Sequence, residues 1–472
     1  MNLINTDVCV IGAGAGGLSV AAGAVQMGAS VVLIENRQMG GDCLNYGCVP
    51  SKSLIAAARA AAAVRTAEQF GVTAKELHID FKQVHQHVHN VIANIAPHDS
   101  PERFTQLGVQ IIRAPAEFID KKTVQAGDCI IKAKYFVVAT GSMPNIPAIP
   151  GLTDTPYLTN ETIFALTDAP QHLLVVGGGP IGCEIAHAYC LLGVPVTLLE
   201  VREILPKDDP ELVVILKQKL IQDGLKLEEN IVINKIYKDI NGINISMKKN
   251  GGEQIINGSH LLIATGRRPN IEALNLIAAG VDHTKTGITV NARLRTTNKR
   301  IYAIGDAISG YQFTHVANYH AGIVLRNILF KLPARVDYRA VPWVTYTGPE
   351  LAQVGLNEQQ ASKSGEKIQI LRWPFVENDR AQTSGETTGL IKVIVNRKGT
   401  VLGVSILGKE AGELLLPWCV AIRERRRINM LTNVIAPYPT LSEISRQVAG
   451  SFYTPLLFSN KIKRLVRWLL RF

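Results

Sequence analysis

The sequence contains one supersecondary pattern twice, and this duplication limits the fold more than any other feature of the chain. In residues 7–35 and again in residues 173–200, an apolar run leads into a glycine-rich turn, a helical stretch and a second apolar run that ends in a glutamate. The spacing G-x-G-x-x-G is met by Gly12, Gly14 and Gly17 and by Gly177, Gly179 and Gly182. Such glycines allow a tight turn, close approach to a pyrophosphate and packing of the helix against the strand. We therefore expect two dinucleotide-binding folds of the α/β class.

The glutamate that closes each copy indicates how the nucleotide is held. Glu35 and Glu200 stand where a carboxylate accepts a hydrogen bond from a ribose hydroxyl. Because a carboxylate repels a 2′-phosphate, Glu200 favours NADH in the second fold, and the nearby Arg202 keeps NADPH as an alternative. Each copy is also followed by an Ala-Thr-Gly segment with Pro-Asn downstream, at 139–145 and 264–270. These parallels indicate a true internal repeat.

Residues 40–52 hold two cysteines separated by four residues, Cys43 and Cys48. The alanine-rich run that follows has high helix propensity, and Pro50 suits a first helical turn, so a helix should begin just after Cys48. Thiols at a helix N-terminus lie in the positive end of its dipole, which favours the thiolate. The spacing would allow a disulfide, so the pair suits redox chemistry, with buried core cysteines or a structural staple as the alternative.

Length and cysteine usage place the chain in a broad class. At 472 residues it is too long for one hydrophobic core and suits about three domains. Apart from the pair Cys43 and Cys48, the seven cysteines are scattered along the chain, so they do not form a secreted disulfide framework. No cationic leader precedes the first apolar run, and no apolar run is long enough to span a bilayer. We therefore expect a cytoplasmic protein.

The net charge of +11 is concentrated near the C-terminus. Residues 423–472 hold ten basic and two acidic residues and so supply eight of the eleven net positive charges. This location indicates a local anionic partner rather than nucleic-acid binding.

The tail 455–472 has the spacing of an amphipathic helix. One face carries Phe458, Ile462, Leu465, Val466, Leu469 and Phe472, and the other carries Lys463, Arg464, Arg467 and Arg471. This pattern is typical of an interfacial helix on an anionic membrane, which predicts peripheral contact of residues 456–472 with the inner membrane face. The alternative is a tail docked on the protein's own surface or across a dimer, because amphipathicity alone does not name a partner.

A metal site is the less favoured interpretation of a histidine-rich segment. Residues 81–95 should form a helix in which His85 and His89 share a face. No third ligand of the right type lies nearby in sequence, so we expect no metal.

Together these features resemble the flavoprotein disulfide reductases, the family of dihydrolipoamide dehydrogenase, glutathione reductase and mercuric reductase. The resemblance covers residues 7–449, and its most specific part is Gly-Gly-Asp-Cys-Leu-Asn-Tyr-Gly-Cys-Val-Pro-Ser-Lys at 40–52. It implies FAD on the first fold, a nicotinamide nucleotide on the second, and a C-terminal α/β domain that makes a homodimer. It also implies a redox-active Cys43–Cys48 disulfide. Electrons from NADH would reach Cys48 by way of FAD, and Cys43 would attack a small oxidised thiol or electrophile.

The resemblance also implies domain boundaries. They are 1–150 for the first part of the FAD-binding domain, 151–270 for the NAD(P)-binding domain, 271–337 for the second part of the FAD-binding domain, 338–454 for the dimerisation domain and 455–472 for the basic tail.

Site residues follow from the same resemblance, position by position. The catalytic residues implied are Cys43, Cys48, Lys52, Glu184, Tyr438 and Glu443. The cofactor-binding residues implied are Gly12, Gly14, Gly17, Glu35, Gly41, Lys52, Thr140, Gly141, Gly177, Gly179, Gly182, Glu200, Gly266, Arg267, Gly305 and Asp306. Lys52 would lie by the flavin N5 edge and pair with Glu184, and Asp306 would bind the ribityl chain.

One position departs from the disulfide-reducing members of this family. They carry a histidine before Pro-Thr, supplied by the partner subunit as acid and base, whereas this chain has Tyr438 there and keeps the orienting glutamate as Glu443. A phenol with a pKa near ~10 is a poor proton acceptor at neutral pH. Mercuric reductases also have tyrosine here, but they deliver mercury through a C-terminal cysteine pair, and the last cysteine of this chain is Cys419. We therefore expect a mercuric reductase-like enzyme whose acceptor is not the mercuric ion.

Two other functions remain open on the sequence. The basic tail suits a membrane-associated NADH dehydrogenase that donates to quinone, although such transfer needs no cysteine pair. Tyr438 suits a redox-sensing flavoprotein with low turnover.

Overall fold

A computed structural model describes residues 2–363 and 365–472. The chain has mixed α/β architecture and divides into two compact units, each built from separate segments of sequence. The first unit comprises Met1–Gly177, Leu191–Val201 and Ile231–Asp337, and the second comprises Gly178–Cys190, Arg202–Asn230 and Tyr338–Phe472.

The main sheet of the first unit has the strand order β3-β2-β1-β6-β5-β4, with β18 paired to β6. Its strands are β1 (Asn2–Ile11), β2 (Val31–Ile34), β3 (Gln110–Ile112), β4 (Ala116–Asp120), β5 (Thr123–Ala126), β6 (Cys129–Val138) and β18 (Ile301–Ala303). Strands β3, β2, β1, β6 and β18 are parallel, and β4 and β5 add an antiparallel edge. The carboxyl end of β1 therefore opens onto the glycine turn, the position where doubly wound sheets bind ligands.

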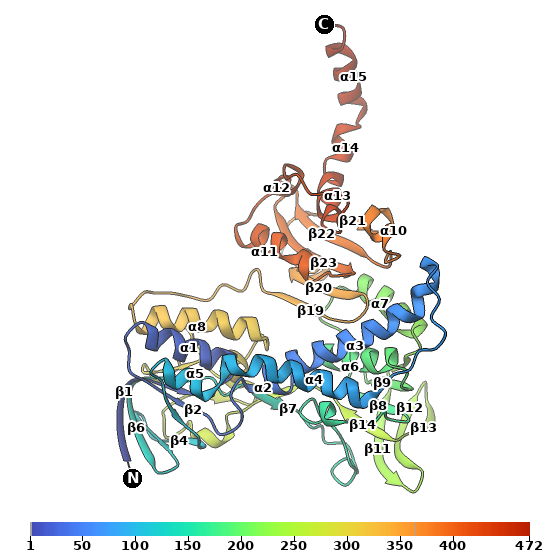
Figure 1. The fold of residues 1–472 in the computed structure, drawn as a ribbon. Coiled ribbons are helices and arrows are strands. Elements are labelled where there is room, and N and C mark those ends of the chain that lie inside the picture. The colour runs from blue at the N-terminus through green and yellow to red at the C-terminus, as the bar shows by residue number, and fades with distance from the viewer. Residues whose placement is uncertain (1, 364) are drawn as a thin grey trace. The chain divides into compact units, whose positions relative to one another are not determined.

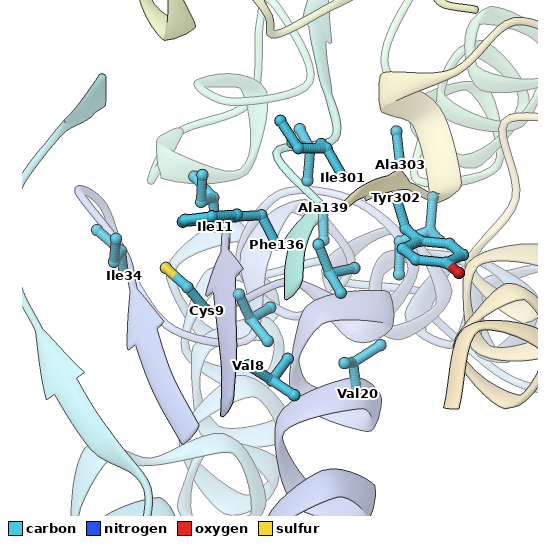
Figure 2. Close-up of a cluster of buried hydrophobic side chains, with 14 of the residues drawn as sticks. Val8, Cys9, Ile11, Val20, Ile34, Phe136, Ala139, Ile301, Tyr302 and Ala303 are labelled. Carbon is cyan, nitrogen blue, oxygen red and sulfur yellow. The ribbon is translucent and has the colours of Figure 1, made fainter. Parts of the chain in front are cut away.

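Helices α1 (Ala15–Gln26) and α8 (Thr314–Ile328) lie side by side over this sheet (Figure 1). Between sheet and helices lies a buried apolar core from β1, β2, β6, β18 and α1, which Figure 2 shows around Phe136 and Val20. The strands of this core are apolar on consecutive residues because parallel strands covered on both faces have no solvent side. This core fixes the turn between β1 and α1.

The cysteine segment forms two successive helices, α2 (Gly41–Asn45) and α3 (Cys48–Thr66). The helix expected just after Cys48 is therefore confirmed, whereas α2 was not anticipated. Further along are α4 (Phe81–Ile95), with the expected bounds, and α5 (Pro101–Gln106). The carboxylate of Asp80 starts α4 by accepting hydrogen bonds from the backbone N–H groups of Lys82 and Gln83.

The second glycine-rich copy lies partly in each unit. In the first unit, β9 (Val196–Glu200), β8 (Leu173–Val176) and β14 (His260–Ile263) are parallel neighbours. They are joined by an antiparallel sheet of β11 (Val232–Asp239), β12 (Gly242–Lys249) and β13 (Gly252–Gly258), which shares their apolar core. Short pairs complete the unit: β7 (Ser142–Pro144) with β15 (Arg267–Pro269), and β16 (His283–Thr284) with β17 (Gly287–Ile288).

The second unit contains a five-stranded antiparallel sheet of order β19-β20-β23-β22-β21. The strands are β19 (Pro342–Thr345), β20 (Glu350–Gly355), β21 (Ile368–Pro374), β22 (Leu390–Asn396) and β23 (Val401–Gly408). Its helices are α6 (Pro180–Leu191), α7 (Pro210–Gln222), α9 (Glu358–Lys363), α10 (Asp379–Thr383), α11 (Leu416–Arg423), α12 (Asn429–Thr432) and α13 (Glu443–Ser451), and β10 (Lys226–Glu229) belongs to it as well. Trp418 is fully buried in the core of this sheet, and its indole N–H donates to Ser445 Oγ at 3.1 Å.

The chain ends in two short helices, α14 (Thr454–Leu457) and α15 (Asn460–Leu469), which continue from α13 in Figure 1. The helical tail expected from the sequence is thus present. None of the described helices combines the length and the apolar character needed to cross a bilayer.

Candidate active site

The glycine turn after β1 holds a buried carboxylate in place. Glu35 is 9% exposed, and its two carboxylate oxygens accept hydrogen bonds from the backbone N–H groups of Ala13 at 2.7 Å and Arg37 at 2.6 Å. Gly12 has φ +104°, and a Cβ there would lie 2.4 Å from the carbonyl oxygen of Ala139. Only glycine fits such a position, so the turn, the acid and the end of β6 form one fixed frame.

The cysteine segment packs backbone to backbone on this turn. The N–H of Gly40 donates to the carbonyl of Ala13 at 2.9 Å. Gly41 has φ +61°, and a Cβ on it would lie 2.7 Å from the Cα of Gly14. The start of α2 is therefore fixed directly against the turn that is expected to approach a pyrophosphate.

The two cysteines are free thiols, and their environments differ. Cys43 lies in α2, and Cys48 is the first residue of α3, where the helix dipole favours a thiolate. The Sγ atom of Cys48 is 3.4 Å from the hydroxyl of Thr314, the first residue of α8. The hydrogen bond from Cys43, the Thr314 hydroxyl and the Lys52 ammonium together lower the pKa of Cys48 to about 6, against the opposing effect of desolvation. The same hydrogen bond, together with burial, raises the pKa of Cys43.

Lys52 follows Cys48 by one turn of α3, and its Nζ lies 3.4 Å from Ser51 Oγ. The position places a positive charge beside the thiolate. On the other side of the pair, the buried Asn160 donates from its side-chain amide to Asp42 Oδ1 at 3.1 Å and to the carbonyl of Tyr46 at 3.2 Å. These contacts hold both ends of α2.

The two Ala-Thr-Gly segments meet each other through β7 and β15. The N–H of Asn145 donates to the carbonyl of Gly266, and the N–H of Asn270 donates to the carbonyl of Gly141, each at 2.9 Å. The internal repeat therefore produces a symmetrical pairing in the first unit, which no local sequence pattern predicts. Its consequence is that Arg267 is brought next to the end of β6.

Arg267 connects three groups around this pairing. Its Nε donates to Ser142 Oγ at 2.7 Å, and a terminal nitrogen lies 3.2 Å from Asp42 Oδ1. Ser142 Oγ in turn donates to Asp306 Oδ2 at 2.6 Å, and Arg267 Nε lies 3.9 Å from the same oxygen. Burial raises the pKa of Asp306, and Ser142 and Arg267 oppose that rise. Arg267, expected beside NADH, thus contacts the groups expected around FAD.

The residues present fit a flavin nucleotide. The hydroxyl of Thr140 is buried and has no hydrogen-bond partner among the described residues. A buried polar atom without a partner is uncommon and points to a bound group. Gly14 leaves open space where a Cβ would stand, with the nearest heavy atom 3.9 Å away, and Glu35 supplies a carboxylate at the end of β2. Next to Asp306, the N–H of Gly305 donates to Nδ1 of the buried His320 at 3.1 Å.

The second copy repeats the first in its glycine geometry. Gly177 has φ +115°, and a Cβ there would lie 2.4 Å from the carbonyl oxygen of Ala264. A Cβ on Gly12 would lie at the same distance from the carbonyl oxygen of Ala139. Glu200 ends β9, as Glu35 follows β2. In the second unit, Gly179 precedes α6 and Gly182 is buried in its first turn.

Glu184 is a buried residue of α6 and accepts a hydrogen bond from the backbone N–H of Tyr346 at 2.9 Å. Its expected pairing with Lys52 joins residues of different units and stays a prediction.

Tyr438 lies on the surface of the second unit, with 70% of the residue exposed. Its hydroxyl donates to Asp379 Oδ2 at 2.8 Å, and this hydrogen bond raises the pKa of the phenol, as Glu443 does to a smaller extent. Glu443 begins α13 five residues later. The phenol therefore keeps its proton at neutral pH and is a hydrogen-bond donor rather than a base.

Sequence reasoning missed several residues around the cysteines and the acidic groups. They are Asn160, Thr314, Ser142, His320 and Asp379. Thr314 is 266 positions from Cys48, and only the fold brings the two together. Of these five residues, Ser142 alone could have been suspected from the sequence, because it directly follows the repeated Ala-Thr-Gly motif.

Among the described residues, no group of three or more histidine, cysteine, aspartate or glutamate side chains is arranged to hold a metal. The rings of His85 and His89 stack with their centroids 4.0 Å apart.

Comparison with protein families finds two matches. Residues 6–321 match the pyridine nucleotide-disulphide oxidoreductase family, and residues 341–449 match the dimerisation domain of the same family.

Similar proteins agree with these matches. Mercuric reductase from Staphylococcus aureus is 35% identical over 449 residues, covering 94% of this chain and 82% of the relative. Dihydrolipoyl dehydrogenase from Geobacillus stearothermophilus is 32% identical over 455 residues, covering 94% and 96%. Among solved structures, the HOCl-induced flavoprotein disulfide reductase RclA from Escherichia coli superposes with a TM-score of 0.85 at 28% identity, covering 94% of this chain and 99% of that one. LpdA from Mycobacterium tuberculosis gives 0.87 at 28% identity over 94% and 99%.

Proposed function

Because the chain belongs to the pyridine nucleotide-disulphide oxidoreductase family, and is thus an FAD-dependent enzyme that uses NAD(P)H, we propose that Cys43 and Cys48 are its redox centre. Electrons leave through Cys43 to a small oxidised thiol or another small electrophile. The observation that carries this proposal is the placement of the pair, with Cys43 in α2 and Cys48 at the start of α3, its Sγ 3.4 Å from the Thr314 hydroxyl.

The first unit supplies the groups that would hold FAD. Glu35 would accept a hydrogen bond from a hydroxyl of the adenosine ribose, and the turn at Gly12, Gly14 and Gly17 would face the pyrophosphate. Asp306 would bind the ribityl chain. Gly41, Thr140, Gly141 and Gly305 would line the same site, and the buried hydroxyl of Thr140 has no hydrogen-bond partner among the described residues. When bound, FAD takes a hydride from NAD(P)H and supplies an electron pair to the cysteine disulfide. The ammonium of Lys52 would stabilise negative charge at that point.

The second glycine-rich copy would hold the nicotinamide nucleotide through Gly177, Gly179, Gly182, Glu200 and Gly266. The carboxylate of Glu200 favours the free 2′-hydroxyl of NADH over a 2′-phosphate. We place Arg267 nearer the FAD side, because its guanidinium contacts Asp42, Ser142 and Asp306.

The cysteine chemistry can be written for a disulfide acceptor. Cys43 attacks one sulfur of the acceptor, the acceptor S–S bond breaks, and the first thiolate leaves. The Cys48 thiolate then attacks Sγ of Cys43, which releases the second thiolate and closes the Cys43–Cys48 disulfide. The acceptor gains two electrons, and water protonates the thiolates.

Proton handling distinguishes this chain from relatives that use histidine. The Tyr438 phenol donates to Asp379 and holds its proton, so it is not the base that activates Cys43. The hydrogen bond from Cys43 to Cys48 offers another route, since the Cys48 thiolate can take the proton as Cys43 attacks and lose it to water before it attacks in turn. We therefore propose acceptors whose leaving groups need little protonation. Aromatic disulfides, which release aromatic thiolates, meet this condition better than alkyl disulfides such as lipoamide. Glu443 would orient Tyr438, as the family glutamate orients histidine.

The chain carries the family dimerisation domain, which supports a homodimer. We propose that the dimer works in the cytoplasm and touches the inner membrane face through residues 456–472. That contact would favour a second function, NADH oxidation coupled to quinone, which would bypass Cys43.

The function is tested with the purified FAD-loaded dimer and two acceptors, an aromatic disulfide and a soluble quinone. Cys43→Ser should abolish NADH-dependent reduction of the disulfide, because the outgoing thiol is lost, while Cys129→Ser should match the wild type. A Cys43→Ser enzyme that still reduces the disulfide would overturn the proposal. If the wild type reduces only the quinone, and both variants reduce it equally well, the quinone function is favoured instead.

A further inference from the structure

We propose that the C-terminal tail, residues 455–472, is an interfacial helix that binds the surface of an anionic lipid bilayer. This inference specifies the partner of the proposed membrane contact and does not depend on which acceptor Cys43 reduces. It rests on the helix geometry, the exposed apolar side chains and the one-sided charge of the tail.

The helix is well defined at both ends. Ser459 Oγ accepts a hydrogen bond from the N–H of Ile462 at 3.4 Å, which caps the first turn of α15. Beyond Leu469, the N–H of Leu470 donates to the carbonyl of Val466 at 2.9 Å, so the turn continues. At 1.5 Å per residue, the ten residues of α15 extend about 15 Å, roughly half the hydrocarbon thickness of a bilayer. Such a helix can lie in the interface but cannot cross it.

One face of the tail exposes large apolar side chains. Their exposed fractions are 48% for Leu465, 46% for Val466, 54% for Trp468, 54% for Leu469 and 94% for Phe472. The preceding segment adds Leu456 and Leu457 of α14 and Phe458 just after it, all more than half exposed. The rings of Trp468 and Phe472 contact edge to face, with centroids 5.3 Å apart. Contiguous exposed apolar surface of this kind marks an interaction site, and tryptophan is enriched where membrane meets water.

The opposite face is basic and lacks acidic groups. Between Ser459 and Phe472 the sequence has five basic residues and no aspartate or glutamate: Lys461, Lys463, Arg464, Arg467 and Arg471. In the part of the chain that the structure describes, none of these five forms an ion pair. An amphipathic helix with apolar residues on one side and free cations on the other matches a bilayer that offers hydrocarbon beneath anionic headgroups.

Charge favours lipid over a second copy of the chain as the occupant of this face. The chain carries a net charge of +11, and the tail itself supplies five of its cations. The same region of a second copy is also basic, with ten basic and two acidic residues in 423–472, and would repel the tail, whereas an anionic lipid surface attracts each Lys or Arg. A dimer would present two tails, and two linked sites bind a surface more tightly than one.

The experiment uses the purified FAD-loaded dimer in flotation with vesicles of phosphatidylcholine alone or of equimolar phosphatidylcholine and phosphatidylglycerol. The wild type should float with the anionic vesicles only, and less so at high salt. Arg464→Gln with Arg467→Gln should weaken binding by about 25-fold, at about fivefold per cation removed. The matched control, Lys121→Gln with Lys122→Gln, removes two exposed cations outside the tail and should leave binding unchanged.

Apolar contact is tested separately with Leu465→Ser and Leu469→Ser, which keep every charge. Binding to anionic vesicles should fall at least tenfold in that variant, because about two leucine burials are lost. Removal of residues 456–472 should abolish flotation while NADH oxidation and sedimentation as a dimer stay at wild-type values. Flotation that ignores lipid charge, or that survives removal of the tail, would overturn the proposal. Dissociation of the dimer on removal of the tail, with no flotation of the wild type, would overturn it in favour of docking between copies.

Discussion

At the scale of single residues, the two cysteines differ in charge because they share one proton. Cys48 begins a helix, faces the Thr314 hydroxyl and lies near Lys52, and each of these favours its thiolate. Cys43 donates a hydrogen bond to that thiolate, which raises the pKa of Cys43 and keeps it protonated. The reduced pair is thus a thiolate next to a thiol, which suits Cys48 to the flavin side and leaves Cys43 to meet the acceptor.

The first prediction concerns the titration of Cys48. The lowered pKa means that the thiolate is present at neutral pH and is lost as the pH falls through about 6. Thr314→Ala removes a hydrogen-bond donor to the thiolate, so the midpoint should move to higher pH. The measurement is the long-wavelength absorbance of the two-electron-reduced enzyme as a function of pH.

Ser53→Ala serves as the control, because among the described residues the Ser53 hydroxyl bonds only to the carbonyl of Val49 within α3. An unchanged midpoint in Thr314→Ala, equal to that of the control, would contradict the assigned role of the hydroxyl.

The second prediction concerns Tyr438. Tyr438→His would place an imidazole, which titrates near neutral pH, beside Glu443. Turnover with an alkyl disulfide should rise by about tenfold or more, since general acid–base catalysis contributes 10²–10⁴ when well placed. Tyr438→Phe should change turnover little. A large loss in Tyr438→Phe, or no gain in Tyr438→His, would show that the phenol takes part directly.

The chemistry of the cysteines could be predicted from sequence, but their polarisation could not. The pair, the helix start and Lys52 lie within one short stretch, so local rules reach them. Thr314 and Asn160 come from distant segments, and no local rule connects either residue to residues 43–48.

At the scale of elements, the duplicated glycine pattern explains how distant segments meet. Gly12 and Gly177 occupy equivalent positions against Ala139 and Ala264. The Ala-Thr-Gly segments that follow pair through β7 and β15, which brings Arg267 to the cysteine helix by way of Asp42. The repeat therefore builds the frame on which α2 rests.

The third prediction tests that frame at Gly41. Gly41→Ala adds a Cβ that would lie 2.7 Å from the Cα of Gly14, at a residue with φ +61°. Backbone atoms cannot yield as a flexible side chain does, so the variant should lose FAD and melt at a lower temperature. FAD content and thermal unfolding of the purified protein measure this.

Gly71→Ala is the matched control, because Gly71 has φ +75° and nothing within 4 Å of its Cβ position. It carries only the cost of a left-handed conformation, about 1–2 kcal/mol. Equal losses in the two variants would show that backbone strain alone, rather than the contact with Gly14, accounts for the effect.

Elements with strong periodicity or a motif were predicted well, and others were not. The second strand–helix–strand copy, α4 and the fold class are confirmed by the structure and the comparisons. The sheet β11–β13 and the helix α2 were missed, because polar alternating strands resemble loops and a five-residue helix has no period to detect. The pairing of β7 with β15 depends on tertiary contact and leaves no local pattern.

At the scale of the whole molecule, the second unit is assembled from segments far apart in sequence. A buried ionic cluster connects them: the Lys392 ammonium on β22 contacts Asp209 at 2.9 Å, Glu211 at 2.9 Å and Glu358 at 2.7 Å. Arg372 adds a two-pronged contact to Glu211, at 2.8 and 2.9 Å. The start of α7 is thereby fixed to the five-stranded antiparallel sheet through β21 and β22.

The fourth prediction is that Lys392→Met destabilises the protein by about 3–5 kcal/mol, because it leaves the fully buried carboxylate of Asp209 without its cation. Arg372 holds the pKa of Glu211 down at about 2, so the cluster's stabilisation is present above the usual glutamate range and is lost as the pH falls toward about 2. Denaturant unfolding at neutral pH measures the loss. Lys409→Met, which removes an exposed pairing with Glu386, should cost under about 1 kcal/mol, and a similar loss in both variants would contradict the role given to burial.

The central claim is that electrons from the nicotinamide nucleotide enter the Cys43–Cys48 pair. Anaerobic titration of the FAD-loaded enzyme with NADH, followed by absorbance, tests it most directly. We expect uptake of two electron pairs per FAD in the wild type, with a long-wavelength band from the Cys48 thiolate, and uptake of one pair without that band in Cys48→Ser. Uptake of two pairs with the band intact in Cys48→Ser would contradict the account.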